Sequence, residues 1–164
     1  MNRRNFISIG LLAGAAVSTA PYFSFAANNN SLPDFDQWQL TNKQWRSRLT
    51  DVQYDILRDA GTERAYSNAM EASKKIGTYH CAGCDLAAYS SEHKYESGTG
   101  WPSFWQPIDL KFVDTKTDFS AIWPRTEVHC ARCGGHQGHI FKDGPQPTGL
   151  RYCLNSASII FKPA

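Results

Sequence analysis

Two C-x-x-C pairs constrain this chain more than any other feature of its sequence. Cys81-Ala-Gly-Cys84 and Cys130-Ala-Arg-Cys133 each aim two thiolates from one tight turn, and four thiolates complete a tetrahedral metal site. The 45 residues between the pairs (85–129) exceed the spacing of a compact zinc finger. We therefore expect one structural zinc ion, bound by Cys81, Cys84, Cys130 and Cys133, that joins two distant parts of the fold.

Two other uses of these cysteines compete with zinc. Disulfides form in oxidising compartments, and a redox-active C-x-x-C pair usually opens a helix in a thioredoxin-like unit. The second alternative, a general thiol oxidoreductase, is disfavoured because the sequence has no βαβ pattern. Two knuckles in one chain favour zinc over both alternatives.

The first 26 residues have the pattern of an export signal. Met1–Arg4 carries two positive charges, Phe6–Val17 is an apolar run of 12 residues, and Ser24-Phe25-Ala26 resembles a cleavage site. Arg3-Arg4-Asn5-Phe6-Ile7 also resembles the twin-arginine export motif of bacteria. We expect a signal peptide at residues 1–26 and a periplasmic mature protein.

A permanent membrane anchor is the alternative reading of this segment. A spanning helix needs about 20 apolar residues, and Pro21 interrupts this one, so we expect no stable membrane insertion after cleavage. Without Arg3 and Arg4 the mature chain carries 15 basic side chains (17 minus 2) and 15 acidic ones. It lacks the basic excess typical of nucleic-acid-binding proteins. We expect a polar linker at 27–40 and one domain at 41–164.

One helix can be predicted from its termini. Thr50-Asp51-Val52-Gln53 fits a capping box, with Leu49 and Tyr54 as a hydrophobic staple and Gly61 as the stop. Ile56 and Leu57 would form its buried face. Residues 62–77 mix helix formers with turn formers and stay unassigned.

From Thr78 onward, short β-branched or apolar runs alternate with turn residues. Examples are Phe112–Thr115, Ser120–Trp123 and Ala157–Phe161. This half of the chain is predicted to be mostly antiparallel sheet.

With four cysteines on a metal, Cys153 is the fifth and only uncommitted one. Arg151-Tyr-Cys-Leu-Asn155 is typical of a strand, whose period of two places Arg151, Cys153 and Asn155 on one face. A polar face around a thiol is unlike a core. Arg151 is expected to stabilise the Cys153 thiolate, unless it is simply a solvated strand arginine, and Asn155 to hydrogen-bond the thiol or a substrate.

Histidines and aromatics supply the remaining candidates. His136-Gln-Gly-His139 has two imidazoles, which fit acid and base work beside Cys153 better than metal binding because four thiolates already fill a tetrahedron. The turn-rich segment Gly98–Trp105 can hold the indole of Trp101 open as a platform for a small apolar group, although core packing is the alternative.

These motifs together resemble the R-type methionine sulfoxide reductases over residues 41–161. The resemblance is carried by Cys81-Ala-Gly-Cys84, Gly98-Thr-Gly-Trp101-Pro-Ser-Phe104, Arg125-Thr-Glu-Val128, Cys130-Ala-Arg-Cys133, His136-Gln-Gly-His139-Ile-Phe141, Asp143-Gly-Pro and Arg151-Tyr-Cys153-Leu-Asn155-Ser. It implies a mainly β fold of two antiparallel sheets with a few peripheral N-terminal helices, and no organic cofactor.

The resemblance also implies how the site works on oxidised proteins or peptides. Cys153 attacks the sulfoxide sulfur, His136 and His139 protonate its oxygen, and Trp101 and Phe141 contact the substrate. The implied site is completed by Arg151 and Asn155. Cys153 then becomes a sulfenic acid.

Many family members resolve that acid with a cysteine two residues before the site tryptophan, where this chain has Thr99. A thioredoxin-like or small-molecule thiol is therefore expected to reduce Cys153 directly. The rival hypothesis is a zinc-binding interaction module in which Cys153 is inert.

Overall fold

The computed structural model describes residue 32 and residues 34–164. The predicted export signal, residues 1–26, lies outside the described residues. Within the described ranges no helix has the length and apolar character needed to cross a membrane. The described part of the predicted linker packs on the domain: Leu32 is buried, and Trp38 in the short 3-10 helix η2 (Phe35–Trp38) stacks 6.3 Å from the ring of Trp45.

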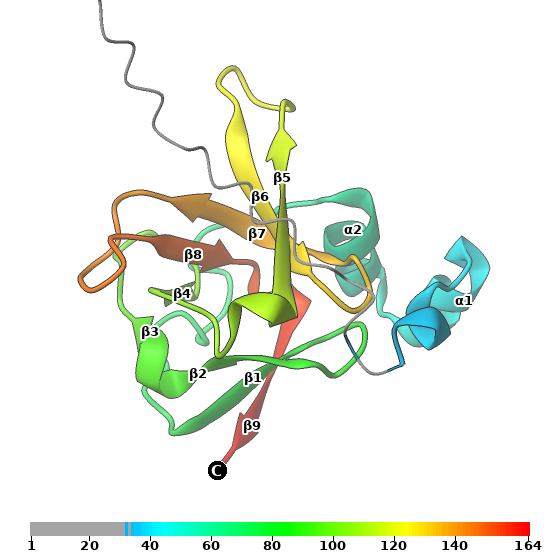
Figure 1. Cartoon of the computed structure of the whole chain (residues 1–164), viewed down its shortest axis with the longest axis horizontal. Helices are drawn as coiled ribbons and strands as arrows, with labels where there is room; N and C mark the ends of the chain where they lie inside the picture. Colours follow the sequence, from blue (N-terminus) through cyan, green and yellow to red (C-terminus); the bar gives the residue numbers. More distant parts are fainter. Residues whose placement is uncertain (1–31, 33) are drawn as a thin grey trace, which may run out of the picture.

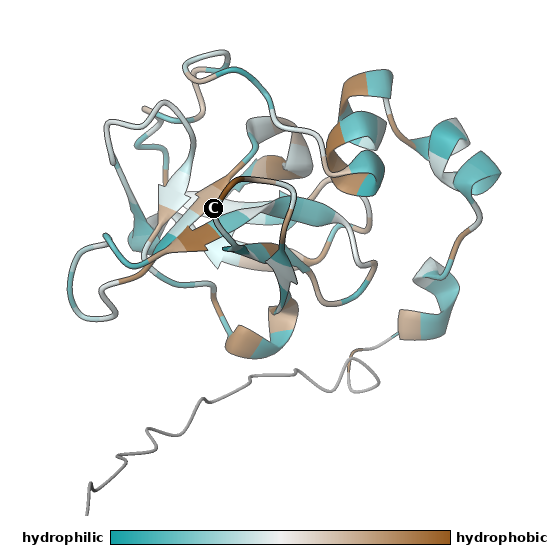
Figure 2. Cartoon of the chain, turned by 90° about the horizontal axis from the view of Figure 1, so that it is seen from above, coloured by the Kyte–Doolittle hydropathy of each residue, from teal (hydrophilic) through white to brown (hydrophobic). Residues whose placement is uncertain are grey.

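Two helices precede the strands, and each begins with a capping box. Thr41 caps α1 (Asn42–Arg48), which sequence reasoning did not predict, and Thr50 caps the predicted helix α2 (Asp51–Asp59). Helix α2 ends before the predicted stop at Gly61, because Ala60 already adopts the left-handed conformation that closes the helix. Figure 2 shows the apolar band of α2 turned toward the strands.

The smaller sheet has three antiparallel strands in the order β2-β1-β9. They are β1 (Gly77–Cys81), β2 (Ala87–Ser90) and β9 (Ile159–Pro163). The last strand of the chain thus pairs with the first, which closes the fold (Figure 1).

The larger sheet has six antiparallel strands in the order β3-β4-β8-β7-β6-β5. They are β3 (Lys94–Tyr95), β4 (Ser103–Phe104), β5 (Val113–Asp118), β6 (Arg125–Cys130), β7 (His136–Phe141) and β8 (Arg151–Leu154). The predicted mainly β fold with two antiparallel sheets and peripheral helices is confirmed.

One predicted strand is wrong. Ser120–Trp123 forms the loop between β5 and β6, and Ile122 and Trp123 are 93% and 79% exposed. Their β-branched and aromatic character favoured a strand, but Pro124 lacks the N–H needed to continue a ladder. The other two examples hold in part: Phe112 ends the 3-10 helix η4 (Leu110–Phe112), and Ala157 lies in η5 (Ser156–Ser158).

Two clusters of buried side chains hold these elements together. One lies between the two sheets and is made of residues from both, including Tyr79 of β1, Tyr89 of β2 and Leu154 of β8. The other lies between the helices and the four knuckle cysteines, with Trp45 and Leu57 at its centre. The cysteines therefore belong to the helix-packing core, while β7 and β8 are the two central strands of the larger sheet (Figure 1).

Candidate active site and cysteine cluster

The four knuckle cysteines converge as the sequence predicted. Their Sγ atoms all lie within 4.8 Å of one another, with Cys81 3.6 Å from Cys133 and Cys84 3.5 Å from Cys130. A disulfide needs about 2.05 Å, whereas four sulfurs at tetrahedral positions on one zinc ion are about 3.8 Å apart. The spacing thus fits a four-coordinate cation rather than two disulfides.

The cysteine cluster joins the two sheets. Cys81 ends β1 of the smaller sheet and Cys130 ends β6 of the larger one, and the turn after each strand carries the second cysteine. Arg58 of α2 donates to the Cys133 carbonyl at 2.9 Å and Arg132 to the Cys84 carbonyl at 3.3 Å. These guanidinium groups offset the negative charge that four thiolates would bring.

Cys153 lies in a transverse row of residues that crosses the whole larger sheet. It is directly opposite His139 of β7 on one side and Ser103 of β4 on the other. Directly opposite residues of neighbouring strands share one face. From edge to edge the row reads Lys116, Glu127, His139, Cys153, Ser103 and Tyr95.

A bulge brings the second histidine onto the same face. Gly138 pairs with Val128 while His136 pairs with His129, so Gln137 is an extra residue on β7. Without the bulge, positions 136 and 139 would point to opposite faces of the strand. With it, the His136 and His139 rings lie 5.4 Å apart between centroids.

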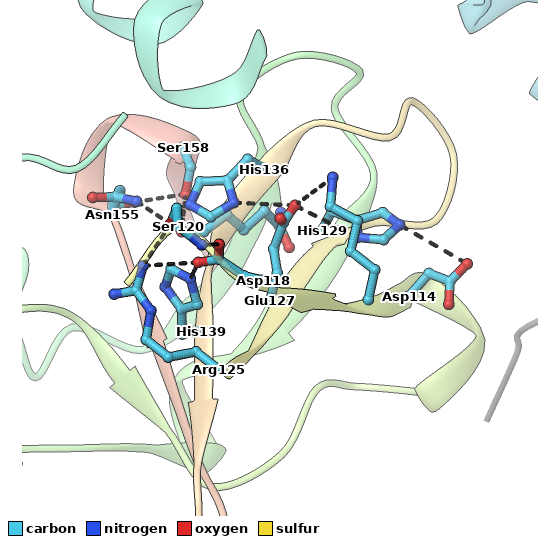
Figure 3. A network of polar contacts seen from close by, with 12 residues as sticks. Asp114, Asp118, Ser120, Arg125, Glu127, His129, His136, His139, Asn155 and Ser158 are labelled. Atoms are coloured by element: carbon cyan, nitrogen blue, oxygen red, sulfur yellow. Dashed lines mark hydrogen bonds and ion pairs between the residues drawn. The ribbon is translucent and has the colours of Figure 1, made fainter. Parts of the chain in front are cut away.

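Each imidazole faces a carboxylate of the same sheet, from the adjacent strand β6 for His136 and from the end of β5, one strand further, for His139 (Figure 3). His139 Nε2 lies 2.7 Å from Asp118 Oδ2, and His136 Nδ1 lies 3.2 Å from Glu127 Oε1. Hydrogen bonds from Ser120, and then from His139, hold the pKa of Asp118 far below its usual range, so Asp118 is an acceptor. His139 therefore donates its Nε2–H to Asp118 and keeps the Nδ1 lone pair free to accept a proton.

Burial lowers the pKa of His139, although Asp118 opposes that shift. The imidazole is accordingly neutral at pH 7. For Glu127, His136 and Lys116 outweigh the effect of burial and lower its pKa. The row thus combines the ionised carboxylate of Glu127 with a neutral base beside the thiol, and Asp118 adds a second carboxylate from outside the row.

Cys153 is half-buried, and the structure differs here from the sequence prediction. Burial raises the pKa of its thiol, and this outweighs the opposing effects of Arg151, Thr99 and Ser103. The predicted stabilisation by Arg151 is present, but it is too small to make a resting thiolate. Ser97 links the two hydroxyls, since its Oγ lies 2.8 Å from both Thr99 Oγ1 and Ser103 Oγ.

Arg151 is shared between three partners. It donates two hydrogen bonds to Asp143, at 2.9 and 2.8 Å, and its guanidinium carbon lies 4.3 Å from the centre of the half-buried Phe141 ring. The guanidinium group is thus held in place by its ion pair with Asp143, next to the strand that carries Cys153.

Asn155 makes no hydrogen bond to Cys153 among the described residues, and each end of its amide is bound to a backbone group. Its Oδ1 accepts from the Glu63 N–H at 3.0 Å, and its Nδ2 donates to the Gln137 carbonyl at 3.2 Å. Strand β8 ends at Leu154, so the strand period does not extend to Asn155. Asn155 instead positions the bulge residue Gln137 beside the chain that follows Cys153.

Glu63 is a residue that sequence reasoning missed. Its carbonyl accepts the indole N–H of Trp101 at 3.2 Å, and its carboxylate accepts from Ser156 Oγ at 2.6 Å and from the Ala157 N–H at 3.3 Å. Glu63 therefore joins the predicted indole platform to the turn that follows the cysteine strand. It lies in the unassigned stretch 62–77, where no periodic pattern marks it.

The fold defines a class of small β proteins in which two sheets meet at a cysteine cluster. A central strand of the larger sheet carries a thiol, and the side chains beside it on the neighbouring strands are polar. Residues 49–163 match the family described as the SelR domain. A peptide methionine sulfoxide reductase MsrB of Leptospira interrogans is 52% identical over 122 residues, which cover 74% of this chain and 93% of that relative. An MsrB of Pseudomonas aeruginosa is 52% identical over 119 residues, covering 73% and 90%.

A chloroplastic peptide methionine sulfoxide reductase B1 of Oryza sativa is 53% identical over 124 residues, covering 75% of this chain and 58% of the rice protein. The match extends over the knuckles, both sheets and the Cys153 strand. The chain belongs to the MsrB family of peptide methionine sulfoxide reductases, which are oxidoreductases.

Proposed function

We propose that this protein reduces the R epimer of methionine sulfoxide in proteins and peptides, with Cys153 as the nucleophile. The observation that carries the proposal is the position of Cys153 directly opposite His139, whose Nδ1 is free to accept a proton. The thiol is thereby next to a neutral base on the same face of the sheet. The family membership supports the reaction type.

In the first step, the Cys153 sulfur attacks the sulfoxide sulfur and forms an S–S bond, and the protonated oxygen then moves to the Cys153 sulfur as the S–O and S–S bonds to the substrate sulfur break. The thiol proton passes to His139 Nδ1 and from an imidazole to the sulfoxide oxygen. His136 is a second proton carrier, because its buried Nε2 has no hydrogen-bond partner within the described residues and would donate once it is protonated. The products are methionine and a Cys153 sulfenic acid, so sulfur is reduced in the substrate and oxidised in the enzyme.

Three contacts would select one epimer. The substrate methyl lies on the indole of Trp101, the oxygen faces the imidazoles, and the sulfur faces Cys153, while Phe141 borders the substrate beside Arg151. With the methyl group, the oxygen and the direction of attack all fixed around a chiral sulfur, one direction is left for the rest of the methionine side chain. The resemblance to R-type reductases assigns that epimer as R.

An external thiol recycles the enzyme in this proposal. Thr99 stands near Cys153 where a resolving cysteine would be, and the other four cysteines form the cluster. One thiol of a thioredoxin-like or small-molecule reductant forms a mixed disulfide with Cys153 and releases water. A second thiol then frees Cys153.

The cysteine cluster is proposed to hold zinc. Cys81, Cys84, Cys130 and Cys133 offer the all-thiolate set typical of structural zinc sites. When bound, zinc would offset two of the four thiolate charges and cross-link the sheets. The role is structural because four ligands leave no open position.

We also propose that residues 1–26 direct export to the periplasm by the twin-arginine route. The consecutive Arg3 and Arg4 before an apolar run support this assignment. Replacing both with lysine should retain the full-length protein in the cytoplasmic fraction of a bacterial host. Periplasmic delivery of that variant at the wild-type level would contradict the assignment.

The function is tested by giving the purified protein separate R and S epimers of a peptide methionine sulfoxide with dithiothreitol. We expect reduction of the R epimer alone, abolished by Cys153→Ser, with zinc content unchanged in the variant. Reduction of the S epimer, or full activity in Cys153→Ser, would overturn the proposal. The second result would favour an interaction module with an inert Cys153.

A further inference from the structure

Three hydroxyl groups lie on the β4 side of Cys153, across β8 from the imidazoles of β7. Ser103 is fully buried on β4 and directly opposite Cys153. Ser97 and Thr99 come from the turn before β4, and Ser97 Oγ lies 2.8 Å from both Thr99 Oγ1 and Ser103 Oγ. Thr99 and Ser103 are both within hydrogen-bonding reach of the Cys153 sulfur. We call Ser97, Thr99 and Ser103 the hydroxyl cluster.

Backbone contacts fix the turn that carries Ser97 and Thr99. Gly98 and Gly100 have φ angles of +72° and +85°, in the region that favours glycine. The Gly98 carbonyl accepts from Tyr66 Oη at 2.6 Å, and the Gly100 carbonyl accepts from the Tyr66 N–H at 2.7 Å. The two hydroxyl groups of the turn are therefore held in place by the backbone as well as by each other.

Each hydroxyl hydrogen has a defined direction while Cys153 is a thiol. Ser103 Oγ donates to the Trp101 carbonyl at 3.1 Å, so its contact with Ser97 is one in which it accepts. Ser97 in turn accepts from Thr99, whose oxygen is left to accept the Cys153 S–H. The donors thus form one chain from the thiol to the Trp101 carbonyl, and each hydrogen is used once.

Loss of the thiol proton changes this pattern without moving a heavy atom. A hydroxyl hydrogen rotates to suit its surroundings, so Thr99 and Ser103 can both turn toward the sulfur. Ser97 stays bonded, because it can donate to either of them and its Oγ accepts the Thr99 N–H at 3.4 Å. The neutral bond from Ser103 to the Trp101 carbonyl is exchanged for a bond to an anion, which is about twice as strong.

Titratable groups on the surrounding strands also act on Cys153. Arg151 of β8 is a cation held in an ion pair with Asp143. His139 of β7 is neutral because burial lowers its pKa, and Tyr95 of β3 is neutral because burial raises its pKa. Arg151 favours the thiolate from a fixed position. The hydroxyl cluster differs from it, because its hydrogens turn toward the sulfur when the sulfur becomes negative.

We propose that the hydroxyl cluster stabilises the Cys153 thiolate when Cys153 leaves its mixed disulfide with an external thiol. Thr99 and Ser103 donate to the sulfur, and Ser97 is a positioning residue that aligns both. The inference rests on the proposed function, because it concerns how Cys153 is recycled there.

The step that the cluster assists is a thiol exchange. The thiolate of a second reductant thiol attacks the outer sulfur of the mixed disulfide and forms a new S–S bond. The bond from that outer sulfur to Cys153 breaks, and its electron pair leaves on the Cys153 sulfur. The reductant is oxidised to a disulfide and Cys153 is reduced to a thiolate. A thiol whose thiolate is better stabilised leaves faster.

The test measures the pKa of Cys153 in the full-length protein, from the pH dependence of its alkylation by iodoacetamide. Mass spectrometry follows the label on Cys153 alone. Thr99→Val removes a hydroxyl group at nearly constant shape, Thr99→Ser keeps it, and Ser103→Ala removes the buried one. Ser158→Ala is the matched control, because Ser158 is as buried as Ser103 and its Oγ donates to the Asn155 carbonyl at 2.6 Å.

We expect the pKa of Cys153 to rise by about one unit in Thr99→Val and in Ser103→Ala, because each variant loses a hydrogen bond to the charged form. Thr99→Ser and Ser158→Ala should keep the wild-type value. A preformed mixed disulfide of Cys153 with glutathione should be reduced by dithiothreitol about threefold more slowly in Thr99→Val and Ser103→Ala. Thr99 is half-buried, so Thr99→Val carries the test if Ser103→Ala does not fold.

An unchanged pKa of Cys153 in Thr99→Val would overturn the inference. An equal rise in Thr99→Ser or Ser158→Ala would also overturn it, because lost packing rather than a lost donor would then be the cause. A raised pKa with an unchanged rate of disulfide reduction would remove the role in recycling. Neither assay contains a sulfoxide, so a failure of the proposed function is seen separately, as no reduction of the R epimer by the wild-type protein.

Discussion

Cys153 and His139 lie directly opposite each other on β8 and β7, with no intervening strand. Their relationship depends on a close approach of the two backbones at Gly138, the neighbour of His139. A Cβ built on Gly138 would lie 2.0 Å from the Cys153 carbonyl oxygen. The thiol and the imidazole are thus brought together by a position at which only hydrogen fits.

Gly138→Ala should therefore separate the two strands at the site. Overpacking in well-packed regions costs about 1–3 kcal/mol, and here the contact is with backbone, which cannot rotate away. We expect a destabilisation of about 3 kcal/mol in urea unfolding and the loss of most sulfoxide reductase activity. Gly149→Ala is the control, because no atom lies within 4 Å of its added Cβ and only its positive φ is strained. Equal effects of the two substitutions would contradict this account.

The pH profile of kcat/KM should be broad and bell-shaped. Attack on the sulfoxide requires one proton shared between Cys153 and His139, so the rate falls when both groups are protonated and when both are deprotonated. Burial lowers the pKa of His139 and raises that of Cys153. The acid limb should thus lie below about 6.5 and the alkaline limb above about 8.5, the ordinary values. An acid limb at or above the ordinary histidine value would contradict the neutral resting imidazole.

Asp118→Asn is the informative variant for this profile. Because Asp118 acts to raise the pKa of His139, its loss should move the acid limb to still lower pH. The plateau rate should fall about 100-fold, since the imidazole loses the acceptor that fixes its tautomer. A matched Asp109→Asn substitution, at an exposed ion pair with Lys111, should leave the profile unchanged.

Thr99→Cys should create an internal recycling route. Thr99 lies within hydrogen-bonding reach of the Cys153 thiol, so a cysteine there can attack the sulfenic acid. We expect a disulfide between positions 99 and 153 after one turnover without reductant, detected by peptide mapping. Thr148→Cys serves as a control at a hydroxyl bound elsewhere, to the Trp105 carbonyl. Failure of Thr99→Cys to form any disulfide would place Thr99 too far from the reacting sulfur.

Removing the metal should unfold the domain, because the cluster joins both sheets and the helices. Metal binding by such sites contributes roughly 10 kcal/mol at neutral pH, comparable to the whole stability of a domain. We expect one zinc per chain by mass spectrometry and loss of the near-UV circular dichroism signal on chelation. Cys84→Ser should behave like the chelated protein, whereas Cys153→Ser should keep its zinc. Chelation without any loss of folded signal would contradict the structural role.

The features of the fold that could be predicted from the sequence depend on residues that are close together in the chain. The knuckles at Cys81 and Cys130 and the capping box at Thr50 each depend on residues three apart, so their spacing alone is informative. The resemblance added the site residues, and the structure brings Cys153, His136, His139, Arg151 and Phe141 onto neighbouring strands.

What sequence could not predict depends on register and on competing energies. Asp118 and Glu127 reach the imidazoles only because of the pairing among β5, β6 and β7, and His136 joins His139 only through the bulge at Gln137. The pKa of Cys153 is decided by two opposing effects, because burial raises it and Arg151 lowers it. Glu63 acts through its carboxylate and its backbone groups together, toward residues far away in the chain, and no local pattern marks it.

The most direct test of the account is the state of Cys153 after a single turnover without reductant. The protein is mixed with one equivalent of peptide R-methionine sulfoxide, treated with dimedone, which labels sulfenic acids, and analysed by mass spectrometry. We predict one label on Cys153 for each methionine formed, and none with the S epimer. Methionine formed while Cys153 stays an unmodified thiol would contradict the central claim.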